Sequence, residues 1–371
     1  MRSTSNRFLR LQIGVAAITL VILMGTPVSG QTPAPSPAPN DTPSIQVGAT
    51  IYADYTYTAS PESTDADGNA FNPSAFNVSR SYINLTGRLS HLIGFRITPD
   101  IVRDTDAGSS MNGSLVFRIK YAFAQVNLDD WMTAGSWTRL GIQQTPWVDF
   151  EENIYRYRFQ GTVFVEREGF LSSSDAGASL HWNAPSNYGD LHAGFYNGEN
   201  YNRTEVNNQK SFQVRGTARP FAQSSTMWMR GLRGHVFYDA DSYVKDGERN
   251  RFVASATYEH RRLNAGVDYL NTADRTLSAA AKVEAGGFSL WATPRFQHGF
   301  EALLRYDRLT PDDRQSNQTR SRTIFGAAYW FPLQGTLATA LLFDVDTQTF
   351  HNITPAPPKQ QRIALHGLLN F

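Results

Sequence analysis

Cysteine is absent from the 371-residue chain, and so is any long apolar run. Without cysteine, a disulfide framework and a thiolate metal site are both excluded. The longest apolar run, at residues 13–24, is shorter than the about 20 residues that a membrane-spanning helix needs. No later segment approaches that length, so a membrane would have to be crossed by strands.

The residue groupings of common catalytic and metal sites are also missing. The eight histidines show no HxxH or HExxH spacing, and no GxSxG motif occurs. A barrel hydrolase would need a serine and a histidine facing the lipid, whereas alternation places His181, His192 and His366 on the opposite face. Nucleic-acid-binding motifs are absent too. We therefore expect no enzymatic activity, cofactor, metal or nucleic-acid partner.

Charge of one sign does not dominate the chain. The formal net charge is +1, from 34 basic and 33 acidic residues. The first 30 residues hold three arginines and no acid, so the remainder carries 31 basic and 33 acidic residues, a net charge of −2. A preference for anions would therefore depend on where the basic side chains lie.

Residues 1–30 have the pattern of a cleaved secretory signal. A basic start precedes the short apolar run, and the small residues Val28, Ser29 and Gly30 follow it. The alternative is an uncleaved anchor. Residues 31–43, QTPAPSPAPNDTP, are proline-rich and predict an extended, solvated linker. Residues 44–371 are then left to form the folded domain.

From residue 44 onward, apolar and polar residues alternate with the period of β-strands. In residues 78–99, for example, Ile83 and Leu85 point one way, while Arg80, Tyr82 and Asn84 point the other. One such hairpin fits a soluble sandwich as well as a membrane barrel. The pattern recurs over 16 predicted strands, with short connections such as 90–91, 297–299 and 334–335 alternating with long ones such as 58–75, 197–209 and 347–359. This indicates an all-β, transmembrane antiparallel β-barrel of the bacterial outer membrane, with both ends on the periplasmic side.

Two local features depart from plain alternation. The predicted strand 115–128 has Phe117, Ile119, Tyr121 and Phe123 on its apolar face, with a phase slip expected only at 125–126. Residues 145–174 are too long and too rich in aromatic and charged residues for an ordinary solvated loop.

Three segments resemble the phosphate-selective porin family of outer-membrane proteins. They are FNVSRSYINLTGRLSHLIGFRITPDI at 76–101, KYAFAQVNL at 120–128, and GIQQTPW at 141–147 with FVERE at 164–168. The resemblance implies a 16-stranded barrel, usually a homotrimer, whose third outer loop folds into the lumen. It also implies a ladder of lumenal arginines leading to a basic constriction. Residues 145–174 match that loop by position, but they carry five acids beside three arginines.

Alternation places a set of basic residues on the lumenal face as candidate pore-lining and anion-binding groups: Arg80, Arg88, Arg96, Arg118, Lys120, Arg139, Arg215, Arg219, Arg233, Arg251, Arg295 and Arg305. Candidate constriction-loop residues are Asp149, Glu151, Glu152, Arg156, Arg158 and Arg167. Arginine is permanently charged, and rings of basic residues favour anions in a pore. Alternatively, these cations pair with nearby acids and brace the wall. The loop aromatics Phe150, Tyr155, Tyr157 and Phe159 either line the pore or pack the loop against the wall.

The sequence thus predicts a porin for passive diffusion of small hydrophilic solutes, with a preference for anions such as phosphate. Its expected surroundings are outer-membrane lipid and two further copies of the chain. The alternatives are a barrel hydrolase and a non-conducting structural or adhesive barrel.

Overall fold

The computed structural model describes residues 41–315, 317–333, 335 and 337–371. The predicted signal segment 1–30 and residues 31–40 of the predicted linker lie outside the described residues. The same is true of Gln334 in the predicted turn 334–335. Those predictions stay predictions.

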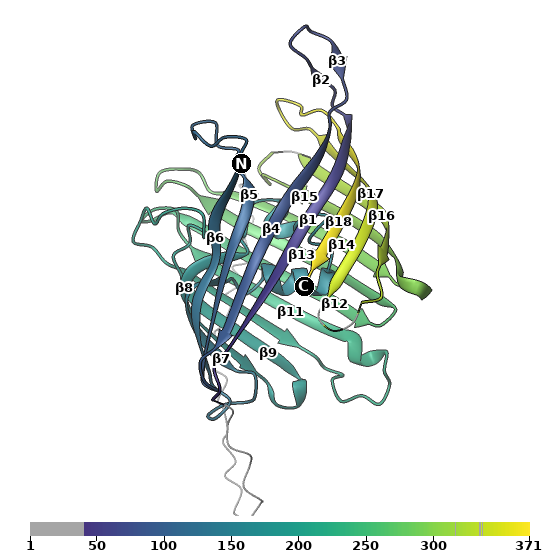
Figure 1. Ribbon diagram of the computed structural model, residues 1–371. Coiled ribbons are helices and arrows are strands. Elements are labelled where there is room, and N and C mark those ends of the chain that lie inside the picture. Colours follow the sequence, from purple (N-terminus) through teal and green to yellow (C-terminus); the bar gives the residue numbers. More distant parts are fainter. Residues whose placement is uncertain (1–40, 316, 334, 336) are drawn as a thin grey trace, which may run out of the picture. The chain divides into compact units, whose positions relative to one another are not determined.

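Sixteen antiparallel strands close into a barrel, because β1 pairs with β18 on one side and with β4 on the other. Figure 1 shows this wall of tilted strands and the small hairpin of β2 (Ser63–Thr64) and β3 (Ala70–Phe71) beyond one rim. The barrel strands are β1 Ser44–Ser60, β4 Ser74–Arg88, β5 Ile93–Arg103, β6 Leu115–Asn127, β7 Trp137–Gln144, β8 Ser174–Asn183, β9 Gly189–Tyr196, β10 Ser211–Ala218, β11 Leu232–Asp241, β12 Glu248–His260, β13 Leu263–Arg275, β14 Val283–Pro294, β15 Phe300–Thr310, β16 Thr319–Trp330, β17 Ala338–His351 and β18 Gln360–Asn370. The predicted fold class and strand number are confirmed.

The outer face of the wall is apolar, as a barrel in lipid requires. Leu140 and Phe195, for example, expose 68% and 62% of their surface on this face. Their neighbours Arg139 and Tyr196 point inward, where charged and aromatic groups meet. The barrel therefore has the architecture of a bacterial outer-membrane protein.

The connections divide into two rims. We call the rim that carries the connections 89–92, 261–262 and 331–337 the turn rim, and the opposite one the loop rim. The turn rim also holds the start of β1 and the end of β18. The alternation of short and long connections is only approximate, because the turn-rim connection 219–231 is longer than the loop-rim connection 242–247. The predicted loop 58–75 is also shorter than expected, since β1 and β4 extend into it.

The predicted phase of β6 is wrong in its second half. The β5–β6 register shifts between Thr98 and Pro99, leaving Lys120 as an extra residue on β6. Proline has no backbone N–H to donate, so the ladder is interrupted there and a bulge forms. As a result, Lys120 and Tyr121 are both buried inside the barrel, although they are adjacent in sequence. Phe123 follows Tyr121 onto the inner face.

Two α-helices, α1 (Val148–Tyr155) and α2 (Phe164–Arg167), belong to the connection between β7 and β8. Three short 3-10 helices lie at the turn rim: η1 Pro185–Asn187, η2 Met229–Gly231 and η3 Gln297–Gly299. Among the described residues, no helix is long and apolar enough to cross a membrane.

Candidate functional site: the barrel constriction

The connection 145–173, here called the inserted loop, lies inside the barrel and packs against one side of the wall. Its side chains Tyr155, Tyr157 and Phe159 are almost fully buried. They form one apolar cluster with lumenal side chains of β11 to β17, namely Phe237, Val253, Leu270, Trp291, Leu303, Ile324 and Leu342. Burying one large apolar side chain contributes about 1.5–3 kcal/mol. Tyr155, Tyr157 and Phe159 therefore pack the loop against the wall and do not line the pore.

Three of the predicted pore-lining arginines hold the backbone of the inserted loop. They donate to its carbonyl oxygens: Arg215 to Pro146 (2.8 Å), Arg251 to Phe170 (3.2 Å) and Arg305 to Thr162 (3.1 Å). A loop buried in the lumen needs such donors, because its backbone oxygens lack strand partners. Each arginine is also paired with an acid: Asp190 at 2.5 Å, Asp274 at 2.8 Å and Asp307 at 2.8 Å, respectively. The structure places these three cations behind the loop, away from open lumen.

Because the loop lies to one side, a cavity of about 480 Å³ remains between it and the rest of the wall. Strands β1, β4, β5, β6, β16 and β18 supply most of its lining. The inserted loop contributes Asp149, Glu152, Asn153, Arg156 and Arg158. The opposite wall contributes Tyr52, Tyr82, Asn84, Arg96, Thr98, Lys120 and Tyr121, together with Trp330, Ala338 and Leu368. We call this cavity the constriction.

Two wall cations in the constriction have neutral partners. Arg96 donates from Nε to Thr98 Oγ1 and from Nη2 to Asn84 Oδ1, both at 2.9 Å. Its guanidinium lies 4.5 Å from the ring centroid of Tyr121, and the Lys120 ammonium lies 5.2 Å from the same centroid. In the described part of the chain, no carboxylate oxygen lies within 4.0 Å of either cation. Neutral acceptors therefore hold Arg96, cation–π contacts position both cations, and the carboxylates of Asp149 and Glu152 act on Lys120 from beyond ion-pair distance.

The loop side of the constriction is largely neutralised. Arg158 pairs with Glu152 at 2.6 Å, and Arg156 pairs with Glu301 of β15 at 3.3 Å. Asp149 accepts a hydrogen bond of 2.6 Å from the Tyr121 hydroxyl. Glu152 thus has an ion-pair partner within the loop, Asp149 has a neutral donor, and Arg156 shares Glu301 with Arg295 of the wall.

The other two constriction-loop candidates point away from the cavity. Glu151 is 2% exposed and accepts a hydrogen bond of 2.7 Å from Trp147 Nε1 within α1. Arg167 donates to Gln160 Oε1 at 2.9 Å, behind the loop. On α1, Asp149 and Glu152 line the cavity and Glu151 does not, because neighbouring residues of a helix project to different faces.

The remaining predicted pore-lining cations are spread over the inner wall. Four are paired with acids: Arg80 and Arg118 with Asp100 at 2.6 and 2.9 Å, Arg233 with Glu259 at 2.8 Å, and Arg295 with Glu301 at 3.2 Å. Arg139 lies 3.7 Å from the ring centroid of Trp137, and Arg219 donates to Asn187 Oδ1 at 2.7 Å. Arg88 ends β4 at the turn rim. Most of these arginines thus brace the wall.

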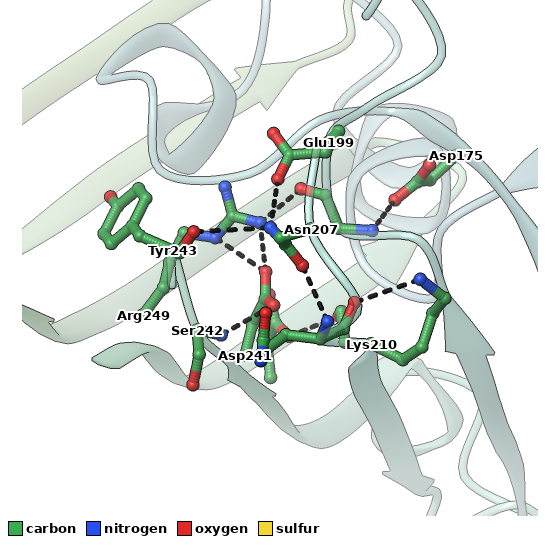
Figure 2. A network of polar contacts seen from close by, with 12 residues as sticks. Asp175, Glu199, Asn207, Lys210, Asp241, Ser242, Tyr243 and Arg249 are labelled. Carbon is green, nitrogen blue, oxygen red and sulfur yellow. Dashed lines mark hydrogen bonds and ion pairs between the residues drawn. The ribbon is translucent and has the colours of Figure 1, made fainter. Parts of the chain in front are cut away.

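The loop-rim connection 197–210, between β9 and β10, reaches side chains of β5 and β6. The Tyr201 hydroxyl donates to Asp100 Oδ2 at 3.4 Å, and the Arg118 guanidinium lies 4.9 Å from the Tyr201 ring centroid. Figure 2 shows the polar network that holds this connection. In it, Arg249 pairs with Asp241, and Asn207 Nδ2 donates to Glu199 Oε1 at 2.9 Å.

Sequence reasoning missed the aromatic part of the constriction. Tyr52 and Tyr82 were placed on the inner face by alternation, but as neutral wall residues. Tyr121 was assigned to the outer face, and its role depends on the bulge at Pro99. The proline within a strand pattern was the one available signal for that bulge.

Comparisons with known proteins agree with this architecture. No protein-family profile and no curated protein matches the sequence. Among solved structures, the anion-selective porin from Comamonas acidovorans is similar, with a TM-score of 0.60 and 11% identity over 89% of this chain and 100% of its own. The outer membrane channel DcaP of Acinetobacter baumannii gives 0.58 and 11% over 89% and 97%. The chain therefore has a porin-like outer-membrane barrel fold.

A third similar structure is a loop-deletion mutant of OmpT, an outer membrane protein of Vibrio cholerae. Its TM-score is 0.60 at 10% identity, over 89% of this chain and 100% of its own. Structural similarity at such low sequence identity establishes a shared fold. The solute and the selectivity have to be argued from the constriction of this chain.

Proposed function

We propose that the porin-like barrel is a passive diffusion channel that favours small anions. The observation that carries this proposal is the position of Arg96 and Lys120 on the constriction without a carboxylate partner among the described residues. A cation that is already paired adds little to the field in a pore, whereas an unpaired one lowers the energy of a passing anion.

No chemical step is involved. An anion entering the constriction gives up part of its hydration, and the Arg96 and Lys120 charges offset that cost. The inserted loop sets the width, and the ion pair between its Arg158 and Glu152 limits the opposing field that the loop adds. The named anion selectivity of the Comamonas structure supports this assignment by analogy.

Under this proposal, phosphate passes through the channel and is not bound tightly. Two unpaired cations supply fewer charges than a ladder of arginines, and Asp149 lies on the same cavity. The homotrimer implied by the sequence resemblance is part of the proposal, and light scattering of the detergent-solubilised protein measures it.

The test is the reversal potential of purified protein in a planar bilayer under a KCl gradient. We expect a value on the chloride side for the native chain. Lys120→Gln should move it toward the cation side. Lys245→Gln is the matched control, because Lys245 is exposed in the loop-rim connection 242–247, outside the constriction.

Each other outcome rejects part of the proposal. A native value on the cation side, or equal shifts for the two variants, would remove Arg96 and Lys120 as the source of selectivity. Absence of conductance from verifiably folded protein would favour the plugged structural barrel instead.

A further inference from the structure

The constriction has two chemically different sides. Arg96 and Lys120 lie on β5 and β6, whereas Trp330, Ala338 and Leu368 lie on β16, β17 and β18. Trp330 and Leu368 are only partly buried and form the edge of the apolar cluster behind the inserted loop, and the Arg156 guanidinium lies 4.3 Å from the Trp330 ring centroid. The apolar core of the barrel is thus continuous with the wall of the cavity.

The basic side has donors for about one anionic group. Arg96 already uses two of its five N–H groups on Thr98 and Asn84, which leaves the two of Nη1 and one of Nη2. The Lys120 ammonium lies over the Tyr82 and Tyr121 rings, at 5.0 and 5.2 Å from their centroids. A carboxylate has two oxygens and matches these two donor groups.

A second negative charge on the solute would meet only cations that already have carboxylate partners, and Arg156 shares its partner Glu301 with Arg295. Arg156 and Arg158 are paired with Glu301 and Glu152. Asp149 adds a negative charge beside Tyr121. The electrostatics therefore favour one anionic charge over two.

From this arrangement we infer that the constriction selects organic monocarboxylates with a compact apolar body over inorganic phosphate and over strongly hydrophilic acids. The carboxylate contacts Arg96 and Lys120, and the apolar body contacts Ala338 and Leu368. The volume of about 480 Å³ falls within the range of small-molecule sites. This inference rests on the proposed channel function and names its solute class.

The test compares hexanoate, gluconate and phosphate as the permeant anion against chloride in planar bilayers, at about pH 7.5, where carboxylates are ionised. Hexanoate and gluconate have the same carbon chain length and charge, and they differ in the hydroxyl groups of gluconate. A protein-free bilayer corrects for hexanoic acid that crosses the lipid. We expect hexanoate to have the highest permeability ratio of the three.

Leu368→Gln should lower the hexanoate permeability ratio about fourfold, the effect of returning roughly one methylene to water, and leave that of gluconate unchanged. Leu333→Gln is the matched control, because Leu333 is exposed in the turn-rim connection 331–337 and does not line the constriction. Ala338→Ser provides a milder change of the same surface if Leu368→Gln does not fold.

The outcomes separate the inference from the function on which it rests. Equal permeability of hexanoate and gluconate, or highest permeability of phosphate, in a chloride-selective channel would overturn the inference and leave the channel standing. An equal effect of Leu333→Gln and Leu368→Gln would also overturn it. Failure of the native chain to conduct, or cation selectivity, would reject the proposed function as well.

Discussion

At the constriction, the effect of a charged residue depends on its nearest partner. Asp149 has a neutral donor, the Tyr121 hydroxyl, whereas Glu152 is paired with Arg158 at 2.6 Å. The two acids are only three positions apart on α1, but the charge of Asp149 remains and that of Glu152 is compensated.

Asp149→Asn should therefore increase the preference for anions. Two unit charges about 5 Å apart in water interact by about 0.8 kcal/mol, so the chloride-to-potassium permeability ratio should rise about fourfold. The reversal potential in a planar bilayer measures it.

The same measurement on Glu151→Gln provides the control, because Glu151 is buried away from the cavity. An unchanged ratio in Asp149→Asn would mean that Asp149 does not face permeating ions.

A titrating group outside the membrane-spanning strands lies in the turn 89–92. Asp41 accepts a hydrogen bond of 2.8 Å from the His91 backbone N–H, and its Oδ1 lies 2.6 Å from His91 Nδ1. His91 Nε2 lies 3.1 Å from Asp130. These two carboxylates raise the pKa of His91 above its ordinary value.

Asp130→Asn should lower the pKa of His91, because one of its two carboxylate partners is then neutral. Histidine NMR of the micelle-bound barrel, recorded across the titration, gives that pKa. Asp106→Asn, in the loop-rim connection 104–114, should leave it unchanged, and an equal shift in both variants would contradict the contact.

At the scale of elements, the inserted loop requires a close approach to the wall. A Cβ atom at Gly287 of β14 would lie 2.9 Å from Phe164 Cζ of α2 and 2.4 Å from the Arg308 backbone oxygen. Glycine at this position lets the loop lie flat against the strand, which keeps the constriction open on the other side.

Gly287→Ala should shift α2 toward the lumen and reduce single-channel conductance. Overpacking of this kind costs about 1–3 kcal/mol, so thermal unfolding of the barrel should also begin at a lower temperature.

Gly286→Ala is the matched control, because its added Cβ would be 3.6 Å from its nearest neighbour, an ordinary contact. Native conductance and stability in Gly287→Ala would show that the loop does not need this approach.

At the scale of the whole molecule, net charge does not determine the proposed selectivity. The region 44–371 carries nearly equal numbers of basic and acidic residues, and most lumenal arginines are paired. The anion preference then comes from a few cations without carboxylate partners, and the ions of the aqueous pore screen their field.

Raising the salt from about 0.1 M to about 1 M should therefore reduce the anion preference, because the Debye length falls from about 10 Å to about 3 Å. Reversal potentials at a fixed concentration ratio measure this decline. A permeability ratio independent of salt would indicate selection by tight binding or by width instead.

The barrel was predictable from local sequence patterns. Period-two alternation indicates which face of most strands meets lipid, with the second half of β6 as an exception, and recurrent turns indicate the number of strands. The inserted loop was also predictable, because residues 145–174 are too aromatic for a solvated connection. Alternation likewise placed Arg96 and Lys120 on the inner face, as observed.

Which inward cations reach the constriction depends on tertiary packing. Arg215, Arg251 and Arg305 satisfy the same alternation as Arg96, yet they lie behind the inserted loop and donate to its backbone. The side of the barrel that the loop covers depends on packing between residues distant in sequence, such as Tyr157 and Trp330. Tyr121 reaches the cavity through a register shift set by Pro99 on the neighbouring strand. Pairing across strands, rather than order along one strand, therefore determines the charge of the pore.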